Sequence, residues 1–598
     1  MVNTLKSYRF FLKYITILLI LFDIARVALI VKYNINIDIW FWIYSLRMDI
    51  IAIFVFLLIP IILFSLNLIL LTRVILTIQI VVFTYLEIAN YLFFEEFHNR
   101  LNYLFVSYLK YPQEIFDMLW ESYKLQIIVV VPLLIFIAIK FFKYSAQLSK
   151  SSILHKILLF PFVFVILFLG IRSSVSDSTP NQSFYSYSNS AMTNEIVNNT
   201  VFSLLYSVYL KSKETMPNYG KLQNKNYKLN LLHHQSTTFK KKKNIVLVLM
   251  ESFGSSYVGS LGGTPTTPHF DTMSKDGLFL SNMYSSSNRS NRGFEAVTSS
   301  LFPTYADSYL KLPKSINNFY TIAKTMQKNG YKTIFLYGGD SKFDNMKGFA
   351  LNNGFDKVID KFDFDKSIKR YTWGVCDEEL YKKANQILNH TKQPLFLMMF
   401  TLSSHKPFDY PDGKIKYYTK APVKSFANSI KYADFALNQF YNSLKNKHFF
   451  KDGVLAMVAD HNAHMFGDQK IPVKEFKIPA LIIAKDLKPQ NIKGVTHQID
   501  IAPTLLDIAG IDATIPTMGI DLTKNKHSRA LIIHRNNFAY LENNKFVLYQ
   551  INKPPIVYNF DYKQLPKDNK LIQKGLMYIY QSYDIYQHQT HKDTDEKH

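Results

Sequence analysis

Cysteine is nearly absent from this chain: among 598 residues there is a single one, Cys376. No intrachain disulfide can form, which is tolerable in a chain long enough to bury a proper core. A metal site built from several thiolates is excluded as well. Any metal that this chain binds must therefore take oxygen and imidazole ligands.

Charge is also scarce, at 19% of the residues, yet lysine and arginine outnumber the acids 69 to 45 and give a formal net charge of +24. A positive excess can indicate a nucleic-acid partner. Long apolar runs accompany it here, so we predict a membrane setting and no nucleic-acid binding. The length alone predicts more than one domain.

Apolar stretches dominate the first third of the chain, near residues 11–31, 49–66, 74–94, 125–142 and 154–171. Several approach the roughly 20 residues that a spanning helix needs. The first could instead be a signal peptide, but it lacks a small-residue cleavage site and further spans follow. We therefore predict an integral membrane protein with five spans.

Basic residues mark alternate loops between these spans. They are Lys6, Arg9 and Lys13 before the first span, Arg73 between the second and third, and Lys140, Lys143, Lys150 and Lys156 between the fourth and fifth. Because positive loops stay in the cytoplasm, everything after about residue 172 should lie outside it.

Four charged residues fall within or at the edges of spans: Asp23, Arg26, Arg47 and Asp49. Charges at such positions are functional candidates by default. They are equally typical of intrahelical pairs at short spacing, or of side chains that snorkel to the interface. We assign them no chemistry.

Composition divides the chain into four parts: a five-helix transmembrane domain (1–172), a partly helical juxtamembrane linker (173–243), a catalytic domain (244–525), and a C-terminal subdomain with a charged tail (526–598). Residues 191–213 are the predicted helix of the linker. The basic run at 240–243 either touches anionic headgroups or is a solvated edge before a strand. The last residues, HKDTDEKH, are predicted to be disordered.

Strands and helices alternate from residue 244 onward. Short apolar runs predict strands at 244–250, 332–337, 394–402, 454–459 and 478–485, with helices at 316–329, 378–390 and 425–446. Alternation of this kind predicts a mostly parallel sheet with helices on both faces. Ligands of such sheets bind beyond the carboxyl ends of the strands.

Acidic and imidazole side chains follow two of these strands. Glu251 comes directly after the first, and Asp460–His461 come directly after the fourth. Together they offer oxygen and nitrogen ligands to one divalent metal. The alternative for Glu251 is an acid in the first turn of a helix, where the helix dipole favours it. The alternative for Asp460 and His461 is a loop acid beside a surface histidine. His464 is a further ligand, or a partner of the ligands, and we expect the second.

A hydroxyl between cations stands in SSSNRSNRG. Arg289 and Arg292 could hold phosphate oxygens around Ser290. A metal would lower the pKa of that hydroxyl and make it a nucleophile. The alternative is a basic Ser/Asn loop without chemistry.

Four further residues are candidates for substrate contacts. His405 follows a strand and either protonates a leaving group or holds phosphate, or is a capping or core histidine. Trp373 and Asp377 are candidates to line a substrate groove, with packing as the alternative for the tryptophan. Asp340 follows a strand beside glycines that allow close backbone approach.

Taken together, these motifs resemble the lipoteichoic acid synthase-like proteins, a group in the sulfatase-like branch of the alkaline phosphatase superfamily. The motifs are Glu251 after the first strand, the hydroxyl near Arg292-Gly293, FDNMKGF, WGVCDE, SSHKPF, ADH and QIDIAPTLLDIAG. The resemblance covers about residues 1–525 and implies an extracytoplasmic sulfatase-like α/β domain anchored in a bacterial cytoplasmic (inner) membrane.

The resemblance also implies a reaction. One manganese-like ion, with Mg²⁺ or Zn²⁺ as alternatives, would be held at Glu251, Ser290, Asp460 and His461. The nucleophile would take phosphoglycerol from phosphatidylglycerol and pass it to a glycan or polymer acceptor, with His405 at the phosphoryl group. The stretch NRSNRGFEA is similar to relatives that decorate periplasmic glucans.

Two departures bear on this expectation. Serine stands at position 290, where the family usually has threonine. The sulfatase motif, Cys or Ser followed by x-Pro-x-Arg, is absent, because Arg292 and Phe294 occupy its second and fourth places. The rival functions are phosphoethanolamine transfer, a phosphodiesterase or sulfatase-like hydrolase, and a non-catalytic membrane scaffold.

Overall fold

A computed structural model describes residues 2–108, 112–148, 150–173, 180, 185, 191–212, 216–223, 231–305, 307–312, 315, 319–341, 343–463, 467–525 and 529–588. The chain forms two compact units. Unit 1 comprises Met1–Glu214 with Gly467–Lys470, and unit 2 comprises Thr215–Phe466 with Ile471–His598. The four predicted domain boundaries stay predictions.

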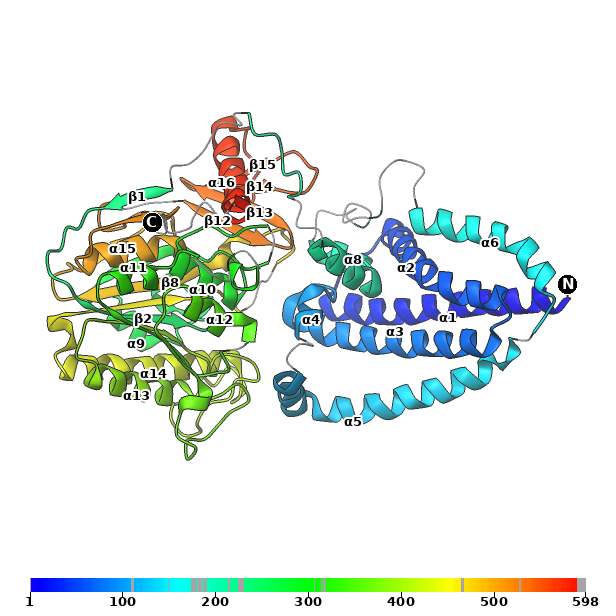
Figure 1. The fold of residues 1–598 in the computed structure, drawn as a ribbon, viewed down its shortest axis with the longest axis horizontal. Coiled ribbons are helices and arrows are strands. Elements are labelled where there is room, and N and C mark those ends of the chain that lie inside the picture. Colours follow the sequence, from blue (N-terminus) through cyan, green and yellow to red (C-terminus); the bar gives the residue numbers. More distant parts are fainter. Residues whose placement is uncertain are drawn as a thin grey trace, which may run out of the picture. The chain divides into compact units, whose positions relative to one another are not determined.

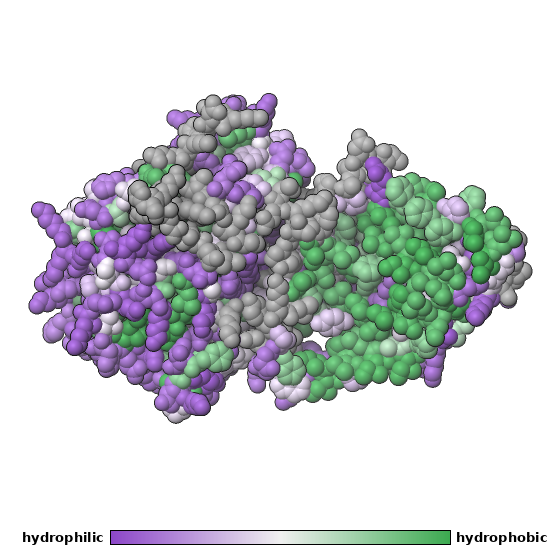
Figure 2. Space-filling model, in the orientation of Figure 1, coloured by the Kyte–Doolittle hydropathy of each residue, from purple (hydrophilic) through white to green (hydrophobic). Residues whose placement is uncertain are grey.

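Unit 1 contains five long apolar helices, which confirms the predicted membrane part of the fold. They are α1 (Val2–Tyr33), α2 (Ile39–Ser65), α3 (Ile69–Phe97), α5 (Pro112–Tyr144) and α6 (Ile153–Arg172), with a short α4 (Tyr103–Tyr108) after α3. α1, α2 and α3 pack on one another, while α5 packs on α3 and α6 on α2. Their outward side chains are largely apolar, as Figure 2 shows for the visible face. Length and composition allow each of the five to cross a membrane.

A buried ion pair links α1 to α2. The guanidinium of Arg26 donates to Asp49 at 2.8 Å, and both side chains are 1% exposed. Arg26 also pairs within its own helix with Asp23 at 2.6 Å. The intrahelical pairing that the sequence suggested is therefore observed between Asp23 and Arg26. Asp49 instead pairs with Arg26 across two helices.

The predicted linker helix is present as α7 (Ala191–Val197) and α8 (Thr200–Ser212). Asp49 and Arg26 also bind these two helices. Asn199 donates to Asp49 at 2.8 Å, and the Arg26 guanidinium donates to the Ile196 carbonyl at 3.2 Å. A second buried arginine, Arg100, donates to the same carbonyl at 2.7 Å.

Unit 2 is built on a sheet in which nine strands of the described residues run in the order β10-β3-β8-β7-β2-β6-β4-β5, with β9 beside β3. The strands are β2 (Asn244–Met250), β3 (Leu278–Tyr284), β4 (Lys332–Tyr337), β5 (Lys357–Ile359), β6 (Leu395–Phe400), β7 (Gly453–Ala459), β8 (Lys477–Ala484), β9 (Gln490–Ile492) and β10 (Thr496–His497). From β7 to β5 all neighbours are parallel, and β8 is antiparallel to both β7 and β3. The Val/Ile/Leu runs of β2 and β7 are almost fully buried, as central parallel strands are.

Helices cover both faces of this sheet (Figure 1). On one side lie α9 (Pro268–Met273), α13 (Asp377–His390) and α14 (Phe426–Asn446), and on the other α10 (Ser290–Ser299), α11 (Ile322–Lys328) and α15 (Ile501–Ile508). A further helix, α12 (Met346–Asn352), precedes β5. The predicted α/β class and its five predicted strands are confirmed, whereas β3 and α10 were not predicted. α11 begins later than expected because Thr321 caps it, accepting a hydrogen bond from the Lys324 N–H.

The C-terminal part is a separate antiparallel sheet of four strands with a helix against it. Its elements are β12 (Ala530–His534), β13 (Asn537–Glu542), β14 (Lys545–Tyr549), β15 (Ile556–Asn559) and α16 (Asn569–His588), and a two-stranded pair joins β1 (Leu232–Gln235) to β11 (Ala513–Pro516). The strands β12 to β15 and α16 lie in the predicted C-terminal subdomain, for which the sequence analysis named no individual strand or helix. The tail HKDTDEKH lies outside the described residues.

Candidate active site

Three predicted ligands meet at the carboxyl end of the central sheet. β2 and β7 are parallel neighbours with Met250 opposite Ala459, so the residues that follow them, Glu251 and Asp460, are adjacent. The Asp460 N–H donates to the Met250 carbonyl at 3.1 Å, which continues the ladder by one step. Ligand atoms of Glu251, Asp460 and His461 all lie within 4.8 Å of one another.

Burial dominates the electrostatics of this cluster. Removal from water, with the other carboxylate close by, raises the pKa of Glu251 to about 7. Burial likewise raises the pKa of Asp460 to about 7 and lowers the pKa of His461. Without a cation, burial therefore favours the protonated carboxyls of Glu251 and Asp460 and the neutral imidazole of His461. A bound cation would balance the charge of the ionised carboxylates.

The second carboxylate oxygen of Asp460 provides a test of metal binding. Oδ1 accepts hydrogen bonds from the Ser252 and His461 N–H groups at 2.7 and 2.6 Å. Oδ2 is buried and accepts no hydrogen bond from the described residues, although it lies 3.4 Å from Nε2 of His461. A buried oxygen left unpaired beside a second carboxylate and an imidazole fits a divalent cation.

Ser290 lies against the same cluster. Its Oγ is 3.2 Å from Oε2 of Glu251 and 3.1 Å from Nε2 of His461. Nδ1 of His461 lies 2.9 Å from the Asn462 carbonyl, which favours a proton on Nδ1 and leaves Nε2 as a lone pair facing Ser290. All four proposed metal-site residues are thus brought together.

Gly293 explains how Ser290 can lie so near the cluster of Glu251, Asp460 and His461. Ser290 is the first residue of α10, and Gly293 stands one turn further along. A Cβ at position 293 would lie 2.6 Å from the carbonyl oxygen of Asp460 and 2.8 Å from its Cα. Only glycine allows the helix to approach this closely.

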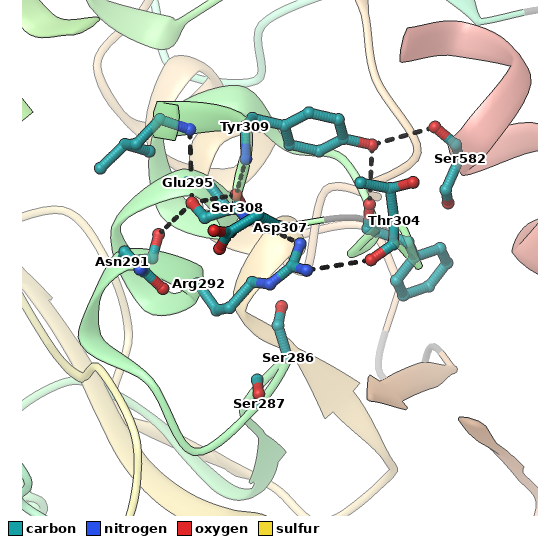
Figure 3. A network of polar contacts seen from close by, with 12 residues as sticks. Ser286, Ser287, Asn291, Arg292, Glu295, Thr304, Asp307, Ser308, Tyr309 and Ser582 are labelled. Carbon is teal, nitrogen blue, oxygen red and sulfur yellow. Dashed lines mark hydrogen bonds and ion pairs between the residues drawn. The ribbon is translucent and has the colours of Figure 1, made fainter. Parts of the chain in front are cut away.

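The two arginines beside Ser290 have different surroundings. Arg289 is close enough to His461 for its charge to lower the pKa of that imidazole. Arg292 is buried and donates to Oε1 of Glu295 at 2.8 Å and to the Thr304 carbonyl at 3.0 Å (Figure 3). These contacts place the Arg292 guanidinium in the protein interior, and its predicted contact with phosphate oxygens stays a prediction.

His405, Trp373 and Asp377 belong to one corner of unit 2. The Trp373 and His405 ring centroids are 4.3 Å apart, and the indole N–H donates to the Lys406 carbonyl at 2.7 Å. His405 lies beyond the end of β6, near enough to Glu251 to influence its pKa. Oδ1 of Asp377 accepts from the Leu402 and Ser403 N–H groups, each at 3.0 Å, and so holds the turn that leads to His405.

Two other predicted site residues, Asp340 and His464, are not among the residues that the structure brings to this cluster. Asp340 follows β4 at the same sheet edge and lies 3.9 Å from the Lys361 ammonium. It is two strands away from β2. His464 lies outside the described residues.

Sequence reasoning missed Asn291 and Asp344. Nδ2 of Asn291 donates to Asp344 at 2.8 Å, and Asp344 also pairs with Lys311 at 2.5 Å. Asp344 has a positive φ of 51°, a conformation that aspartate tolerates better than most residues. The motif FDNMKGF contains Asp344, but nothing in the motif indicates a contact with Asn291, the residue after Ser290.

Comparison with known proteins agrees with this geometry. A family model described as Sulfatase matches residues 243–511. A protein of the alkaline phosphatase superfamily from Vibrio parahaemolyticus is 35% identical, with a TM-score of 0.59 over 63% of this chain and 95% of its own. The chain belongs to the alkaline phosphatase superfamily.

Within this superfamily the chain is similar to lipoteichoic acid synthases, the resemblance that its motifs predicted. It is 27% identical over 331 residues to lipoteichoic acid synthase 1 of Bacillus subtilis and 26% identical over 324 residues to the lipoteichoic acid synthase of Staphylococcus aureus. These alignments cover 50% of this chain and 51% and 50% of the relatives, so the chain spans about half the length of the curated relatives it matches. The lipoteichoic acid synthase LtaP of Listeria monocytogenes shares the fold, with a TM-score of 0.52 and 22% identity over 58% of this chain and 93% of its own.

Proposed function

We propose that this protein transfers a phosphoglycerol group from phosphatidylglycerol to an extracytoplasmic glycan or polymer through a covalent intermediate on Ser290. The observation that carries the proposal is the position of the Ser290 hydroxyl, within 3.2 Å of both a carboxylate and an imidazole of a buried cluster that suits a divalent metal. The relatives named lipoteichoic acid synthase support the same reaction class.

Glu251, Asp460 and His461, together with Ser290, would hold the ion. Manganese is the ion that we propose first, with magnesium or zinc as alternatives. When bound, it supplies Lewis acidity, which favours the ionised hydroxyl at neutral pH and stabilises negative charge on the phosphoryl oxygens.

The first step is a displacement at phosphorus. Oγ of Ser290 attacks, the bond from phosphorus to the diacylglycerol oxygen breaks, and a phosphoglyceryl-serine forms. Ser290 enters this step as the ionised hydroxyl, its proton having gone to solvent. The leaving diacylglycerol oxygen takes a proton from Nε2 of His405, which begins the step protonated on both ring nitrogens. Nδ1 of His405 lies 3.0 Å from the Lys406 carbonyl, so a proton there leaves Nε2 for the reaction.

The second step reverses the proton movement. An acceptor hydroxyl gives its proton to His405 and attacks the phosphoglyceryl-serine, and the Ser290 oxygen departs. Arg289, next to the nucleophile, is the side chain that we assign to the phosphoryl oxygens, in preference to Arg292. We assign Asp377 to the turn that positions His405, and Trp373 to the ring packing that orients its imidazole.

Membrane anchoring suits a lipid donor, because donor and catalytic unit share one surface. We place the protein in the bacterial cytoplasmic membrane as a multi-pass protein with unit 2 outside the cytoplasm. Alternate basic loops and the five apolar helices support this orientation.

The intact mass of the full-length protein tests the proposal after incubation with Mn²⁺ and phosphatidylglycerol, beside a phosphatidylethanolamine sample. A gain of one phosphoglycerol unit is expected in the wild type and in Ser287→Ala, a matched change in the same serine run, but not in Ser290→Ala. A phosphoethanolamine adduct would assign the protein to the sister transferases. No adduct and no diacylglycerol with either lipid would overturn the transferase proposal.

A further inference from the structure

We propose that unit 1 binds an anionic phospholipid in a groove between α1, α2 and α6, as a site distinct from the Ser290 cluster. The groove has a volume of about 680 Å³, within the range of roughly 300–1,000 Å³ that ligand pockets span. Its lining consists of Lys6, Tyr8, Arg9, Phe11, Leu12 and Ile15 of α1, Phe54, Leu57 and Ile61 of α2, and Leu159, Phe162, Val163, Ile166 and Leu167 of α6.

The groove exists because α6 packs on α2 and leaves the space toward α1 unfilled. Side chains of α1, α2 and α6 all line it. Leu12 of α1 and Phe162 of α6 are 65% and 72% exposed in the protein alone. Apolar walls of this kind, on helices long enough to cross a membrane, fit a hydrocarbon chain.

One end of the groove is basic. Lys6 and Arg9 are exposed, line the groove and form no ion pair with a described residue. Lys156, also near this end, is already engaged, since its ammonium donates to the Phe64 carbonyl and to Asn67. The sequence has no Asp or Glu in residues 1–22, 50–86 or 122–176, so nothing acidic in these segments competes for the two cations.

An apolar cavity that ends in two cations matches a lipid whose headgroup carries a phosphate and no compensating positive charge. Alternate basic loops assign this end to the cytoplasmic leaflet. A lipid held there is on the side opposite to the proposed transfer reaction, so the inference does not depend on that reaction. The bound lipid would fill the gap between the first and fifth spans and stabilise unit 1.

Native mass spectrometry of the full-length protein tests this, in a Ser290→Ala background that prevents turnover. The probes are dioleoyl phosphatidic acid and dioleoyl phosphatidylcholine at matched concentration. We expect the parent protein to retain phosphatidic acid preferentially and to melt at a higher temperature with it. Lys6→Gln with Arg9→Gln should weaken retention at least about tenfold, since each basic residue near a membrane surface contributes about a factor of five.

Three further variants make the outcome decisive. Lys140→Gln with Lys143→Gln removes the same charge from the same end of unit 1 but outside the groove lining, and should retain phosphatidic acid like the parent. Ile166→Trp should reduce retention by filling the groove. Unchanged retention in the Lys6/Arg9 variant, equal loss in the Lys140/Lys143 variant, or equal retention of both lipids by the parent would overturn the proposal. Retention of phosphatidic acid by Arg9→Lys shows that loss in the Lys6/Arg9 variant reflects charge and not misfolding.

Discussion

Gly293 packs directly against the backbone of Asp460: a methyl group at position 293 would lie 2.6 Å from the Asp460 carbonyl oxygen. This contact joins the helix that starts at Ser290 to the strand end that carries a proposed metal ligand. It therefore sets how close the proposed nucleophile comes to the buried carboxylates.

Gly293→Ala is expected to push α10 away from Asp460 and to slow adduct formation by about 100-fold, because a misplacement of about 1 Å can cost that much. The rate of adduct formation, followed by intact mass, is the measurement. Val297→Ala on the same helix is the control, since it creates a cavity but leaves the Gly293 contact unchanged. A Gly293→Ala protein that reacts at the wild-type rate would contradict the positioning argument.

Glu295 compensates the buried charge of Arg292. It accepts from Arg292 at 2.8 Å and from Ser308 and Tyr309, each at 2.6 Å (Figure 3). Glu295→Ala removes the buried carboxylate to which Arg292 donates and should lower the free energy of unfolding by about 3–5 kcal/mol. Denaturant unfolding of the full chain in detergent measures this. Arg292→Met added to Glu295→Ala should recover part of the loss, and a further loss of similar size would argue against a coupled pair.

Metal affinity should increase with pH up to about 7. Burial raises the pKa of Glu251 and of Asp460 to about 7 in the metal-free protein, so both carboxyls bind protons below that pH and must release them to bind a cation. The apparent affinity for Mn²⁺ should therefore rise by about tenfold per pH unit for each proton released, and level off above pH 7.

Calorimetric titration of the full-length protein with Mn²⁺ between about pH 5.5 and 8 measures this slope. Because a raised carboxyl pKa favours the protonated folded state, the same shifts should make the metal-free protein less stable as pH rises from about 4.5 to about 7, with no further loss above that pH. In Asp460→Asn the slope should fall by about one proton, and an unchanged slope would exclude Asp460 as a ligand.

Asp377→Ala should slow the reaction without weakening metal binding. Asp377 accepts from the Leu402 and Ser403 N–H groups and holds the turn before His405, but it does not belong to the cluster of Glu251, Asp460 and His461. We expect a fall of about 100-fold in turnover with an unchanged Mn²⁺ dissociation constant. Glu379→Ala, in the first turn of the same helix, is the control. A parallel loss of metal affinity would contradict a role limited to His405.

Asp49→Ala should destabilise unit 1. The substitution removes the fully buried carboxylate from Arg26 and leaves it only the half-exposed Asp23, which should cost about 3–5 kcal/mol. Thermal unfolding in detergent is the measurement. Glu95→Gln is the control, because Glu95 is 46% exposed where it pairs with Lys32, and an exposed pair of this kind is worth at most about 1 kcal/mol. Equal effects of the two substitutions would show that the Arg26–Asp49 pair contributes little.

The sequence by itself determined the features that depend on local composition. Five apolar stretches predicted the five long helices, and apolar runs that end in Glu251 and Asp460 predicted which side chains reach one sheet edge. Both predictions use only short-range patterns, because a spanning helix needs length and hydrophobicity and a parallel strand directs its carboxyl end to a shared edge.

Only the tertiary structure decided the partners of the charged residues. Arg292 stands two positions after Ser290, and in a helix that spacing turns the two side chains about 200° apart, so the arginine enters the interior toward Glu295. Nothing in the local sequence indicated that Ser290 begins a helix, because Ser and Asn are common both in loops and at helix starts. Arg26 and Asp49 could not be paired from sequence either, because their contact depends on how α1 packs on α2. Such contacts depend on how segments that are distant in the sequence pack together. The residues next to each partner in the sequence do not determine that packing.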